Sequence, residues 1–332
     1  MVRLMSAVYG PVPSWRFGRS LGVDVITPPK KCTFDCIYCQ LGRTKNRVST
    51  PDNLQCSLPC PATVISDLDN ILGRIDLHTV DVVTFSGNGE PTLNLSLGEI
   101  AKQVKARIGE LPMVVLTNSS LLYRQDVRRN LSMFDFVVAK LDAADNEVFK
   151  QVNRPATKEL NSEMIIESIK QLKREIGGTL ALETMLLQSV DGRVTNVKSS
   201  HLENLVNAII SIQPDIVQLE VPYRPPSENY ILPPDKEKLK MASQRISEVL
   251  GEERVWTYGI RDRSSRKVRW LEHKSLERDV LELLKRRPCR TIDVSTSLGI
   301  DEAIAQKLLE DLEKKGKIKV AKAKEQRFYV ER

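Results

Sequence analysis

Short runs of β-branched and apolar residues alternate with longer amphipathic stretches through the middle of the chain. The runs have the length and composition of buried strands, and the stretches between them repeat apolar residues at the spacing of one helix face. The predicted strands are residues 21–26, 80–86, 113–119, 136–142, 180–187 and 215–221. The clearest predicted helices are residues 96–109, 161–178 and 196–212.

Strand–helix units in one series require parallel strands joined by right-handed crossovers. The predicted fold class is therefore α/β, either a doubly wound sheet or a full or partial (β/α) barrel, and periodicity alone does not choose between them. No apolar run approaches the roughly 18 residues of a membrane-spanning helix. The first 20 residues are interrupted by prolines and lack the apolar centre of a signal peptide. We therefore expect a cytoplasmic protein with no membrane partner.

The pattern changes near the C-terminal end. Residues 256–270 are polar and charged and predict a linker or an excursion from the core. Three predicted helices follow, at residues 277–288, 291–299 and 301–316, and then a β-hairpin over 317–332. Three helices followed by a hairpin are typical of a winged helix-turn-helix. We therefore predict two domains with a boundary near residue 272, covering residues 1–272 and 273–332.

Three of the six cysteines of the chain, Cys32, Cys36 and Cys39, fall within eight positions. In a reducing compartment, clustered cysteines hold metal more often than they pair with one another. A tetrahedral zinc site would need a fourth ligand, and none of the three histidines is near in sequence. An iron–sulfur cubane has four irons, so three cysteines leave one iron open for an outside ligand. A structural zinc site and a redox-sensor cluster are the alternatives.

A second motif follows the predicted strand at residues 80–86. Residues 87–91 are Gly-Asn-Gly-Glu-Pro. An Asn-Gly pair alone would predict a hairpin turn, but a helical pattern follows here instead of a partner strand. Glycines at the C-terminal end of a strand allow the backbone to approach a ligand closely. The motif therefore predicts a ligand-binding loop.

The C-x3-C-x2-C spacing, with Tyr38 before its last cysteine and the Gly-Asn-Gly-Glu-Pro loop after the next strand, resembles the signature of the radical S-adenosylmethionine (SAM) superfamily. The segments GVDVITPPKKCTFDCIYCQLGRT, TFSGNGEPT, AKLDA and QLEVPYRPP together resemble an archaeal and bacterial branch of iron–sulfur oxidoreductases. That branch is related to the radical enzyme that builds the tricyclic wybutosine precursor (4-demethylwyosine) on tRNA. The resemblance covers roughly residues 15–230, and a winged helix is a frequent companion in that branch.

The resemblance implies a partial (β/α)6 barrel with one 4Fe–4S cluster and S-adenosyl-L-methionine as cofactors. In such enzymes a ferredoxin- or flavodoxin-like donor reduces the cluster, and SAM is cleaved to methionine and a 5′-deoxyadenosyl radical that removes a substrate hydrogen atom. The resemblance implies that Cys32, Cys36 and Cys39 bind the cluster and that SAM chelates the open iron. It also implies that the loop backbone and Glu90 receive the methionine amino group. Asn88 stands where the superfamily usually has a small residue.

Other candidates come from the ends of the predicted strands. The functional face of such barrels is the C-terminal end of the strands, where inward side chains alternate with period two. Short polar side chains there suit the hydroxyl groups of the SAM nucleoside. The expected cofactor-binding residues are Tyr38, Ser86, Gly87, Asn88, Gly89, Glu90, Asn118, Asp142 and Glu183. The expected catalytic or substrate-binding residues are Lys140, Gln188, Gln218, Glu220, Tyr223 and Arg224. Salt bridges that merely close the barrel are the alternative interpretation of the charged members.

The remaining cysteines leave one question open. Cys56 and Cys60 could bind an auxiliary cluster, completed by Cys289 or by a substrate atom, or they could be inert thiols. The wybutosine enzymes carry further cysteines before their radical motif, and this chain has none before Cys32. We therefore do not expect their condensation of pyruvate at a second cluster.

The charge pattern bears on the partners. The net charge is +7, and residues 1–50 contain eight Lys and Arg against two Asp. The predicted recognition helix, residues 301–313, contains five acidic residues and one Lys, so specific DNA readout is not expected. Residues 314–332 contain eight Lys and Arg against two Glu. These basic ends favour a tRNA substrate. One alternative is a peptide or protein substrate, with the winged helix as recognition module. The other is a cluster-bearing regulator without turnover, but such a regulator would not need the intact Gly-Asn-Gly-Glu-Pro loop.

Overall fold

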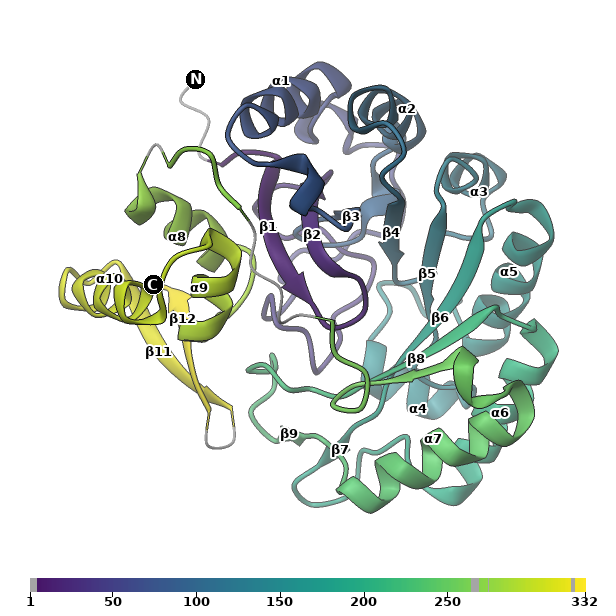
Figure 1. Cartoon of the computed structure of the whole chain (residues 1–332). Helices are drawn as coiled ribbons and strands as arrows, with labels where there is room; N and C mark the ends of the chain where they lie inside the picture. Colours follow the sequence, from purple (N-terminus) through teal and green to yellow (C-terminus); the bar gives the residue numbers. More distant parts are fainter. Residues whose placement is uncertain (1–4, 264–268, 274, 324–325) are drawn as a thin grey trace.

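A computed structural model of the chain describes residues 5–263, 269–273, 275–323 and 326–332. Its core is one eight-stranded sheet in the order β1-β2-β3-β4-β5-β6-β8-β10 (Figure 1). These strands are β1 (Val8–Ser14), β2 (Gly18–Asp24), β3 (Val82–Ser86), β4 (Met113–Thr117), β5 (Phe136–Lys140), β6 (Thr179–Met185), β8 (Ile216–Glu220) and β10 (Val255–Thr257). Two further strands, β7 (Gln188–Ser189) and β9 (Ile231–Leu232), pair with each other outside the sheet.

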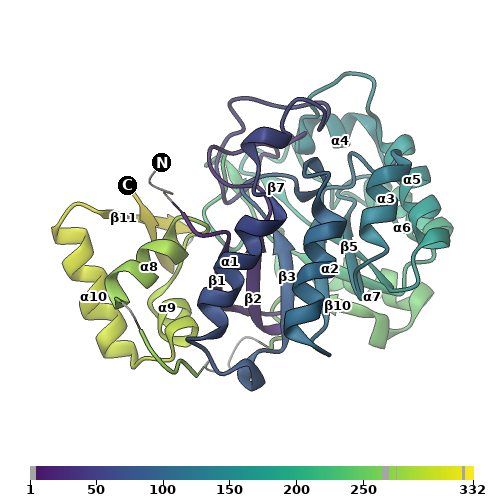
Figure 2. The same cartoon turned by 90° about the horizontal axis from the view of Figure 1, so that it is seen from above.

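Within this sheet, β2, β3, β4, β5, β6, β8 and β10 are parallel, and β1 pairs antiparallel with β2. Because the order of the parallel strands in space follows their order in the chain, every crossover moves in the same direction. A doubly wound sheet would reverse its direction at a switch point. The sheet instead curls into a half barrel, with helices along its convex side (Figures 1 and 2). This confirms the predicted α/β class and the series of six parallel strands, and it decides between the two predicted architectures.

The helices of the barrel begin and end at residues that explain their bounds. The Asn161 side chain accepts a hydrogen bond from the Met164 amide at 2.9 Å and so caps the N-terminus of α5. Gly109, with a φ of 61°, ends α2. The helices are α1 (Pro61–Leu72), α2 (Leu97–Ile108), α3 (Gln125–Leu131), α4 (Asn146–Asn153), α5 (Ser162–Glu175), α6 (Ser199–Ile212) and α7 (Lys236–Leu250). None of the helices described has the length and apolarity that crossing a bilayer requires.

Two strands of the eight-stranded sheet, β1 and β10, were not predicted, and neither were the short strands β7 and β9 outside it. β1 contains Pro11 and Pro13, which are usually excluded from strands, but β1 is an edge strand and needs hydrogen bonds on one side only. β10 lies in the segment predicted as a linker, residues 256–270, and pairs in parallel with β8. Residues 264–268 of that segment lie outside the described residues. The prediction of a linker was therefore wrong for the residues that form β10.

The turn between β1 and β2 reaches across to the other edge of the sheet. The Trp15 and Tyr258 rings lie 5.8 Å apart, centroid to centroid, and the Phe17 and Trp256 rings lie 6.1 Å apart. Phe17 also packs into the apolar interior of the barrel with Val82, Val114, Val138 and Ala181. We call this contact between the two sheet edges the barrel seam. It closes the half barrel on the side where the sheet has no further strand.

The C-terminal residues form a separate cluster of elements, which we call the C-terminal unit (residues 275–332). It contains α8 (Leu276–Leu284), α9 (Thr291–Leu298), α10 (Glu302–Lys314) and the antiparallel strands β11 (Ile318–Ala323) and β12 (Gln326–Glu331). These elements follow the predicted order, whereas the domain boundary near residue 272 stays a prediction. The unit has its own apolar core, which also includes Val12 of β1, and it lies beside β1 (Figure 1). It is therefore packed against one edge of the barrel.

Candidate active site

A cavity of about 340 Å³ lies inside the half barrel at the C-terminal ends of its strands. Its wall is formed by the strand ends, the cysteine loop that follows β2, the turn between β1 and β2, and the C-terminal unit. All three cysteines of the motif line it. The other predicted site residues in the wall are Tyr38, Ser86, Gly87, Asn88, Gly89, Glu90, Asn118, Lys140, Glu183, Glu220, Tyr223 and Arg224. Residues far apart in the sequence therefore meet at one site.

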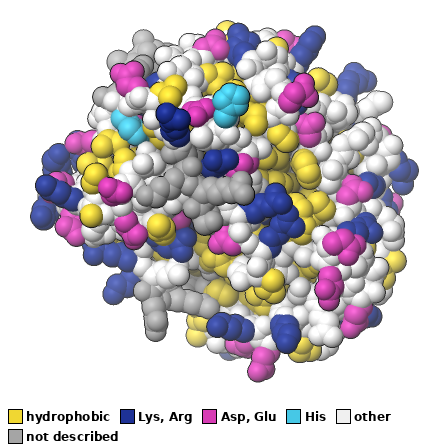
Figure 3. All heavy atoms as spheres, viewed as in Figure 1, with side chains coloured by type: hydrophobic (Ala, Val, Ile, Leu, Met, Phe, Trp, Pro, Cys, Tyr) yellow, Lys and Arg dark blue, Asp and Glu magenta, His cyan; other side chains and the backbone are white. Residues whose placement is uncertain are grey.

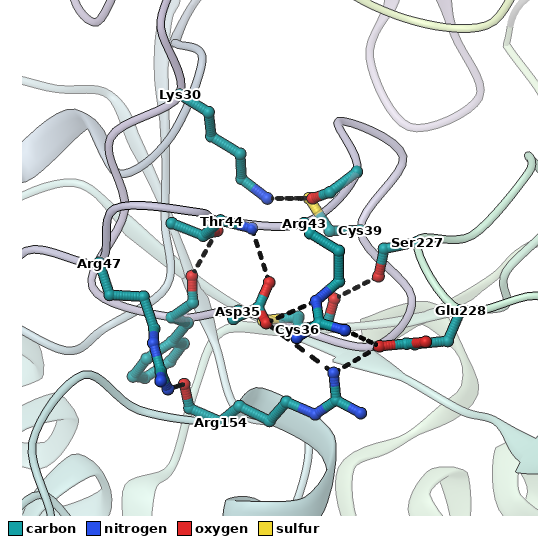
Figure 4. A network of polar contacts seen from close by, with 12 residues as sticks. Lys30, Asp35, Cys36, Cys39, Arg43, Thr44, Arg47, Arg154, Ser227 and Glu228 are labelled. Atoms are coloured by element: carbon teal, nitrogen blue, oxygen red, sulfur yellow. Dashed lines mark hydrogen bonds and ion pairs between the residues drawn. The ribbon is translucent and has the colours of Figure 1, made fainter.

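The cysteine loop is held in place by charged side chains on its outer side (Figure 4). Asp35 accepts hydrogen bonds from the Thr44 amide at 2.6 Å and from the Arg43 Nε at 2.8 Å. Glu228 binds the guanidinium groups of Arg43 and Arg154 at 2.8 and 2.5 Å. Asp35 is buried, whereas the side chain of its partner Arg43 is 56% exposed, so this ion pair lies at the protein surface. The conformation of the loop is thus fixed by contacts that do not involve the cysteine sulfurs.

Each cysteine sulfur of the motif receives a hydrogen bond from a nitrogen. Lys30 Nζ lies 3.2 Å from Cys39 Sγ, and Asn118 Nδ2 lies 3.5 Å from Cys32 Sγ. Asn153 Nδ2 lies 3.5 Å from Cys36 Sγ. Such donors stabilise thiolate ligands and tune the potential of an iron–sulfur cluster.

The environment of the thiols also indicates a positively charged ligand. Burial raises the pKa of the Cys36 thiol to about 12, and burial also raises the pKa of the Cys32 thiol. Thiolates at these positions therefore need a compensating positive charge, which iron supplies. Within the described residues, no three His, Cys, Asp or Glu side chains are arranged to bind a single metal ion. A cubane takes one cysteine per iron, so its cysteines do not converge on one point. The donor set fits a cubane and not the alternative of a zinc site.

The Gly-Asn-Gly-Glu-Pro loop packs against the start of the cysteine loop. A side chain at Gly89 would place its Cβ 1.5 Å from the Lys31 carbonyl oxygen, and Gly89 has a φ of +145°. A Cβ at Gly87 would lie 2.7 Å from the Ile26 side chain. In the structure these glycines allow a close approach of the chain's own residues Lys31 and Ile26, while the predicted approach of the loop backbone to a ligand stays a prediction. The two glycines therefore set the position of the cysteine loop relative to β3.

Glu90 is a buried carboxylate within this loop, only 1% exposed. Its Oε1 accepts hydrogen bonds from the Thr92 amide, the Thr92 hydroxyl and the Thr117 hydroxyl at 3.1, 2.6 and 2.7 Å. Its Oε2 accepts one bond, from the Asn118 amide at 2.7 Å. Burial raises the pKa of Glu90, although the Thr117 and Thr92 hydrogen bonds oppose that rise. Because a carboxylate oxygen has two lone pairs, Oε2 can accept one more donor from the cavity.

The charged side chains inside the barrel form ion pairs with one another. Glu183 binds both Lys140 and Arg16, and Arg16 also donates to Gln218 at 3.3 Å. Glu220 accepts a hydrogen bond from Trp15 Nε1 at 3.2 Å. Burial opposes ionisation of Glu220, but the Arg16 and Lys140 cations lower its pKa below the ordinary glutamate value. The salt-bridge interpretation thus describes Lys140 and Glu183 in the structure, while both side chains still line the cavity.

Three predicted site residues lie outside the cavity wall. Asp142 accepts hydrogen bonds from Tyr38 at 2.5 Å and from Asn153 at 2.6 Å. It therefore supports the cysteine loop from behind, and burial together with Asp142 raises the pKa of Tyr38 well above its ordinary value. Gln188 lies on β7 and binds Lys238, while Gln218 is fully buried. Direct ligand contact by these three residues is not supported.

Several residues at the site were missed by the sequence analysis. Arg16 comes from the turn after the unpredicted β1, and Asn153 ends α4. Asp24, Arg286 and Arg287 also line the cavity, the last two from the C-terminal unit. The auxiliary-cluster hypothesis gains no support, because Cys56 and Cys60 are exposed and Cys289 is buried in the core of the C-terminal unit. The sequence carries no pattern that brings Arg286 or Arg287 to the barrel.

Comparison with known proteins agrees with this site. The family model for the radical SAM superfamily matches residues 26–191. A UPF0026 protein of Methanocaldococcus jannaschii is 30% identical over 286 residues, which cover 86% of this chain and 84% of that protein. A UPF0026 protein of Synechocystis is 38% identical over 219 residues, covering 66% of this chain and 76% of that protein.

Among solved structures, Streptococcus suis SuiB bound to S-adenosylmethionine aligns with a TM-score of 0.48 and 14% identity, over 72% of this chain and 51% of SuiB. The assignment rests on the two sequence matches and the family model, not on this alignment. This chain therefore belongs to the radical SAM superfamily, whose members are enzymes that use a 4Fe–4S cluster and S-adenosylmethionine.

Proposed function

We propose that the chain holds its cluster through Cys32, Cys36 and Cys39 and acts on a substrate in the cavity between the barrel and the C-terminal unit. The observation that carries this proposal is that three sulfurs, each with a nitrogen donor, line the same cavity as the Gly-Asn-Gly-Glu-Pro loop. When bound, the reduced cluster and SAM supply a 5′-deoxyadenosyl radical that abstracts a hydrogen atom. A ferredoxin- or flavodoxin-like donor would supply the electron.

The residues of the chain would position the cofactor. Oε2 of Glu90 would accept a hydrogen bond from the methionine amino group, because it has a free lone pair at the cavity wall. Ser86 and Asn118 line the cavity at the ends of β3 and β4 and carry the short polar side chains that suit ribose hydroxyls. Asn118 also contacts Cys32 Sγ, so the cluster and the cofactor would share one supporting side chain.

Replacing Glu90 with Gln tests this arrangement. Anaerobically reconstituted and reduced protein is expected to release 5′-deoxyadenosine from SAM without substrate, and Glu90→Gln is expected to weaken SAM binding. A hydrogen bond to a charged group contributes about 1.5–3 kcal/mol, so the expected loss is roughly ten- to a hundredfold in Kd, measured by equilibrium binding. The iron content should be unchanged, because Glu90 is not expected to contact the cluster.

The matched control for Glu90→Gln is Thr92→Val. Thr92 binds the same carboxylate but does not line the cavity. If Thr92→Val weakens SAM binding as much as Glu90→Gln, the carboxylate acts only by holding the loop. If Glu90→Gln loses its iron, the loop supports the cluster and the proposed role of Glu90 is wrong.

The substrate class is a second step of the proposal, for which we favour RNA. The C-terminal unit would be a winged helix whose hairpin contacts phosphates without reading sequence. Lys319 and Lys322 on β11 are exposed and form no ion pair with another described residue. Three other cations of the basic segment are paired: Lys315 and Lys317 share Glu277, and Arg327 binds Glu313. Lys324 lies outside the described residues. On the face in Figure 3 basic and acidic side chains are interspersed, so the expected RNA contacts are few.

Reversing the charges of Lys319 and Lys322 on the hairpin tests this proposal. Each phosphate contact contributes about 0.7–0.9 to the slope of log affinity against log salt concentration, so Lys319→Glu with Lys322→Glu should flatten the slope for tRNA by about 1.4–1.8. The control is Lys236→Glu with Lys240→Glu, which makes the same charge change on exposed positions of α7. Equal slopes for the two double variants, or tight binding that does not depend on salt, would favour a protein substrate instead.

A further inference from the structure

The cavity extends from the cysteine loop to the junction between the barrel and the C-terminal unit. Two arginines from opposite sides of this junction line its wall. Arg224 follows β8 on the barrel side, and Arg287 lies in the segment that joins α8 to α9. A ligand reaching this end of the cavity would therefore meet both the barrel and the C-terminal unit.

Both arginines are held in place by their surroundings. Arg287 Nη1 donates to the Pro13 carbonyl at 3.3 Å, and two residues further on Cys289 pairs with the Tyr329 backbone in both directions, at 3.0 and 2.7 Å. The Arg224 guanidinium lies 4.6 Å from the centre of the Tyr223 ring. Tyr223 in turn stacks on Tyr258, with the ring centres 4.4 Å apart. Such groups are pre-organised, so a ligand would lose little of its binding energy in ordering them.

The guanidinium groups of these two arginines have buried nitrogens without acceptors. Nε and Nη2 of Arg287 and Nε of Arg224 are buried and donate to no other described residue. Neither arginine forms an ion pair with a described carboxylate; Arg224 donates from Nη1 to the neutral Gln40 amide at 2.8 Å. Leaving buried donors of a charged group unpaired costs free energy. A water molecule or a ligand that enters the cavity would supply the acceptors that these nitrogens lack.

The neighbouring cations differ because they are already paired. Arg286 binds Asp24 at 2.8 Å, Arg290 binds Asp293 at 2.9 Å, and Arg16 binds Glu183. Glu220 accepts a hydrogen bond from Trp15, and its pKa is lowered chiefly by the Arg16 and Lys140 cations and to a smaller extent by Arg224. Arg224 and Arg287 are thus the cations at the junction that lack a direct ion pair among the described residues, although Asp293 lies close enough for both of them to lower its pKa. Two guanidinium groups match the charge of one phosphate dianion better than that of one carboxylate.

We propose that Arg224 and Arg287 form a phosphate-binding site and that the substrate is a phosphorylated compound whose phosphate dianion is held there while its reacting carbon faces the cluster. This inference rests on the proposed function and names the chemical group by which that site recognises its substrate. It also assigns the C-terminal unit a part in the active site, because one of the two ligating side chains belongs to it. Phosphate bound between them would strengthen the contact of the unit with the barrel.

The test is a titration of reconstituted full-length protein, in the presence of saturating SAM, with inorganic phosphate followed by phosphorus NMR. Arg287→Gln and Arg224→Gln are each expected to weaken phosphate binding at least tenfold. Lys285→Gln is the matched control, since it removes a positive charge from the same segment without altering the cavity wall, and it should change the Kd by less than twofold. Phosphate should also raise the Tm of the wild-type protein and not that of Arg287→Gln. Circular dichroism tests whether each variant is folded. If Arg287→Gln is not folded, Arg287→Lys, which keeps the charge, replaces it.

Three results would overturn the proposal. The first is phosphate binding that is the same in wild type, Arg287→Gln and Arg224→Gln. The second is acetate binding as tightly as phosphate with the same dependence on Arg287, which would make the site one for a carboxylate. The third is competition between phosphate and SAM, which would place the anion at the cofactor. Phosphate binding is measured without turnover and is therefore independent of catalysis. If phosphate binding depends on Arg287 but the protein does not cleave SAM, the proposed function is wrong and the phosphate-binding site stands.

Discussion

Cys36→Ala protein is expected to retain no 4Fe–4S cluster after anaerobic reconstitution, whereas the wild type should bind about one cluster per chain. The same result is expected for Cys32→Ala and Cys39→Ala. Each cysteine would bind a different iron, so the loss of one thiolate leaves that iron without its protein ligand. Iron and sulfide analysis together with the visible absorption of the cluster measure the outcome.

The matched controls for these variants are Cys56→Ala and Cys60→Ala. Both cysteines are exposed and neither lines the cavity, so the iron content of these variants should equal that of the wild type. Retention of full iron by Cys36→Ala would contradict the cluster assignment. Loss of part of the iron in Cys56→Ala would instead indicate the auxiliary cluster that the sequence left open.

The barrel was predictable where the local pattern of residues decides the structure. The β-branched runs at residues 80–86 and 113–119 become β3 and β4 because such runs suit strands buried on both faces. β2 begins earlier than predicted, at Gly18, because its pairing with β1 extends it to residues that are not apolar. β1 was missed because its prolines argue against a strand until its position at the sheet edge is known.

The site was predictable where period-two alternation continues to the end of a strand. This rule places Lys140, Glu183 and Glu220 in the cavity wall. It fails for Asp142, two residues beyond Lys140, because the chain has already left β5 and the side chain packs behind Tyr38. The local sequence does not reveal that the segment after β5 changes direction. Side chains beyond the last strand residue therefore require the three-dimensional structure.

The contribution of the C-terminal unit was not predictable for a different reason. Arg286 and Asp24 are separated by 262 positions, and neither belongs to a motif. Their contact depends on how the unit packs against β1, which is decided by apolar residues such as Val12. The sequence indicates three helices and a hairpin with its own core, and a unit with its own core could pack in many places. The position of Arg287 in the cavity follows from this packing alone.

The ion pair between Asp24 and Arg286 is expected to dominate the stability of this packing. Both side chains are 3% exposed, and Arg286 Nε lies 2.8 Å from Asp24 Oδ2. Arg286 also binds Glu282 at 3.0 Å and lies 4.2 Å from the centre of the Tyr9 ring. Arg286→Met would leave the Asp24 carboxylate buried without its cation. Removing one partner of a buried ion pair costs about 3–5 kcal/mol in the free energy of unfolding, which urea titration measures.

Two further variants separate the loss of the ion pair from other effects. Arg245→Met removes a cation from an exposed pair with Glu203 and should cost no more than about 1 kcal/mol. Arg286→Met combined with Asp24→Asn removes both charges, and because replacing both partners of a buried pair is often nearly neutral, it should recover most of the stability. If Arg286→Met lowers the free energy of unfolding by no more than Arg245→Met does, the Asp24–Arg286 ion pair does not hold the C-terminal unit in place.

The cost of Arg286→Met should also depend on pH, because burial raises the pKa of Asp24 even beside Arg286. Without Arg286 that pKa rises further, since burial and the nearby Glu282 both disfavour the carboxylate. The folded variant then keeps a proton on Asp24 at pH values at which the unfolded chain, with an ordinary Asp pKa, has already released it. The variant therefore loses stability as pH rises from the ordinary Asp pKa through the raised pKa of the folded state. We therefore expect the destabilisation relative to wild type to be smaller at about pH 5 than at about pH 8. If Arg286→Met lowers the free energy of unfolding equally at both pH values, Asp24 is solvated once Arg286 is removed. The contact between the barrel and the C-terminal unit would then open when this one cation is lost.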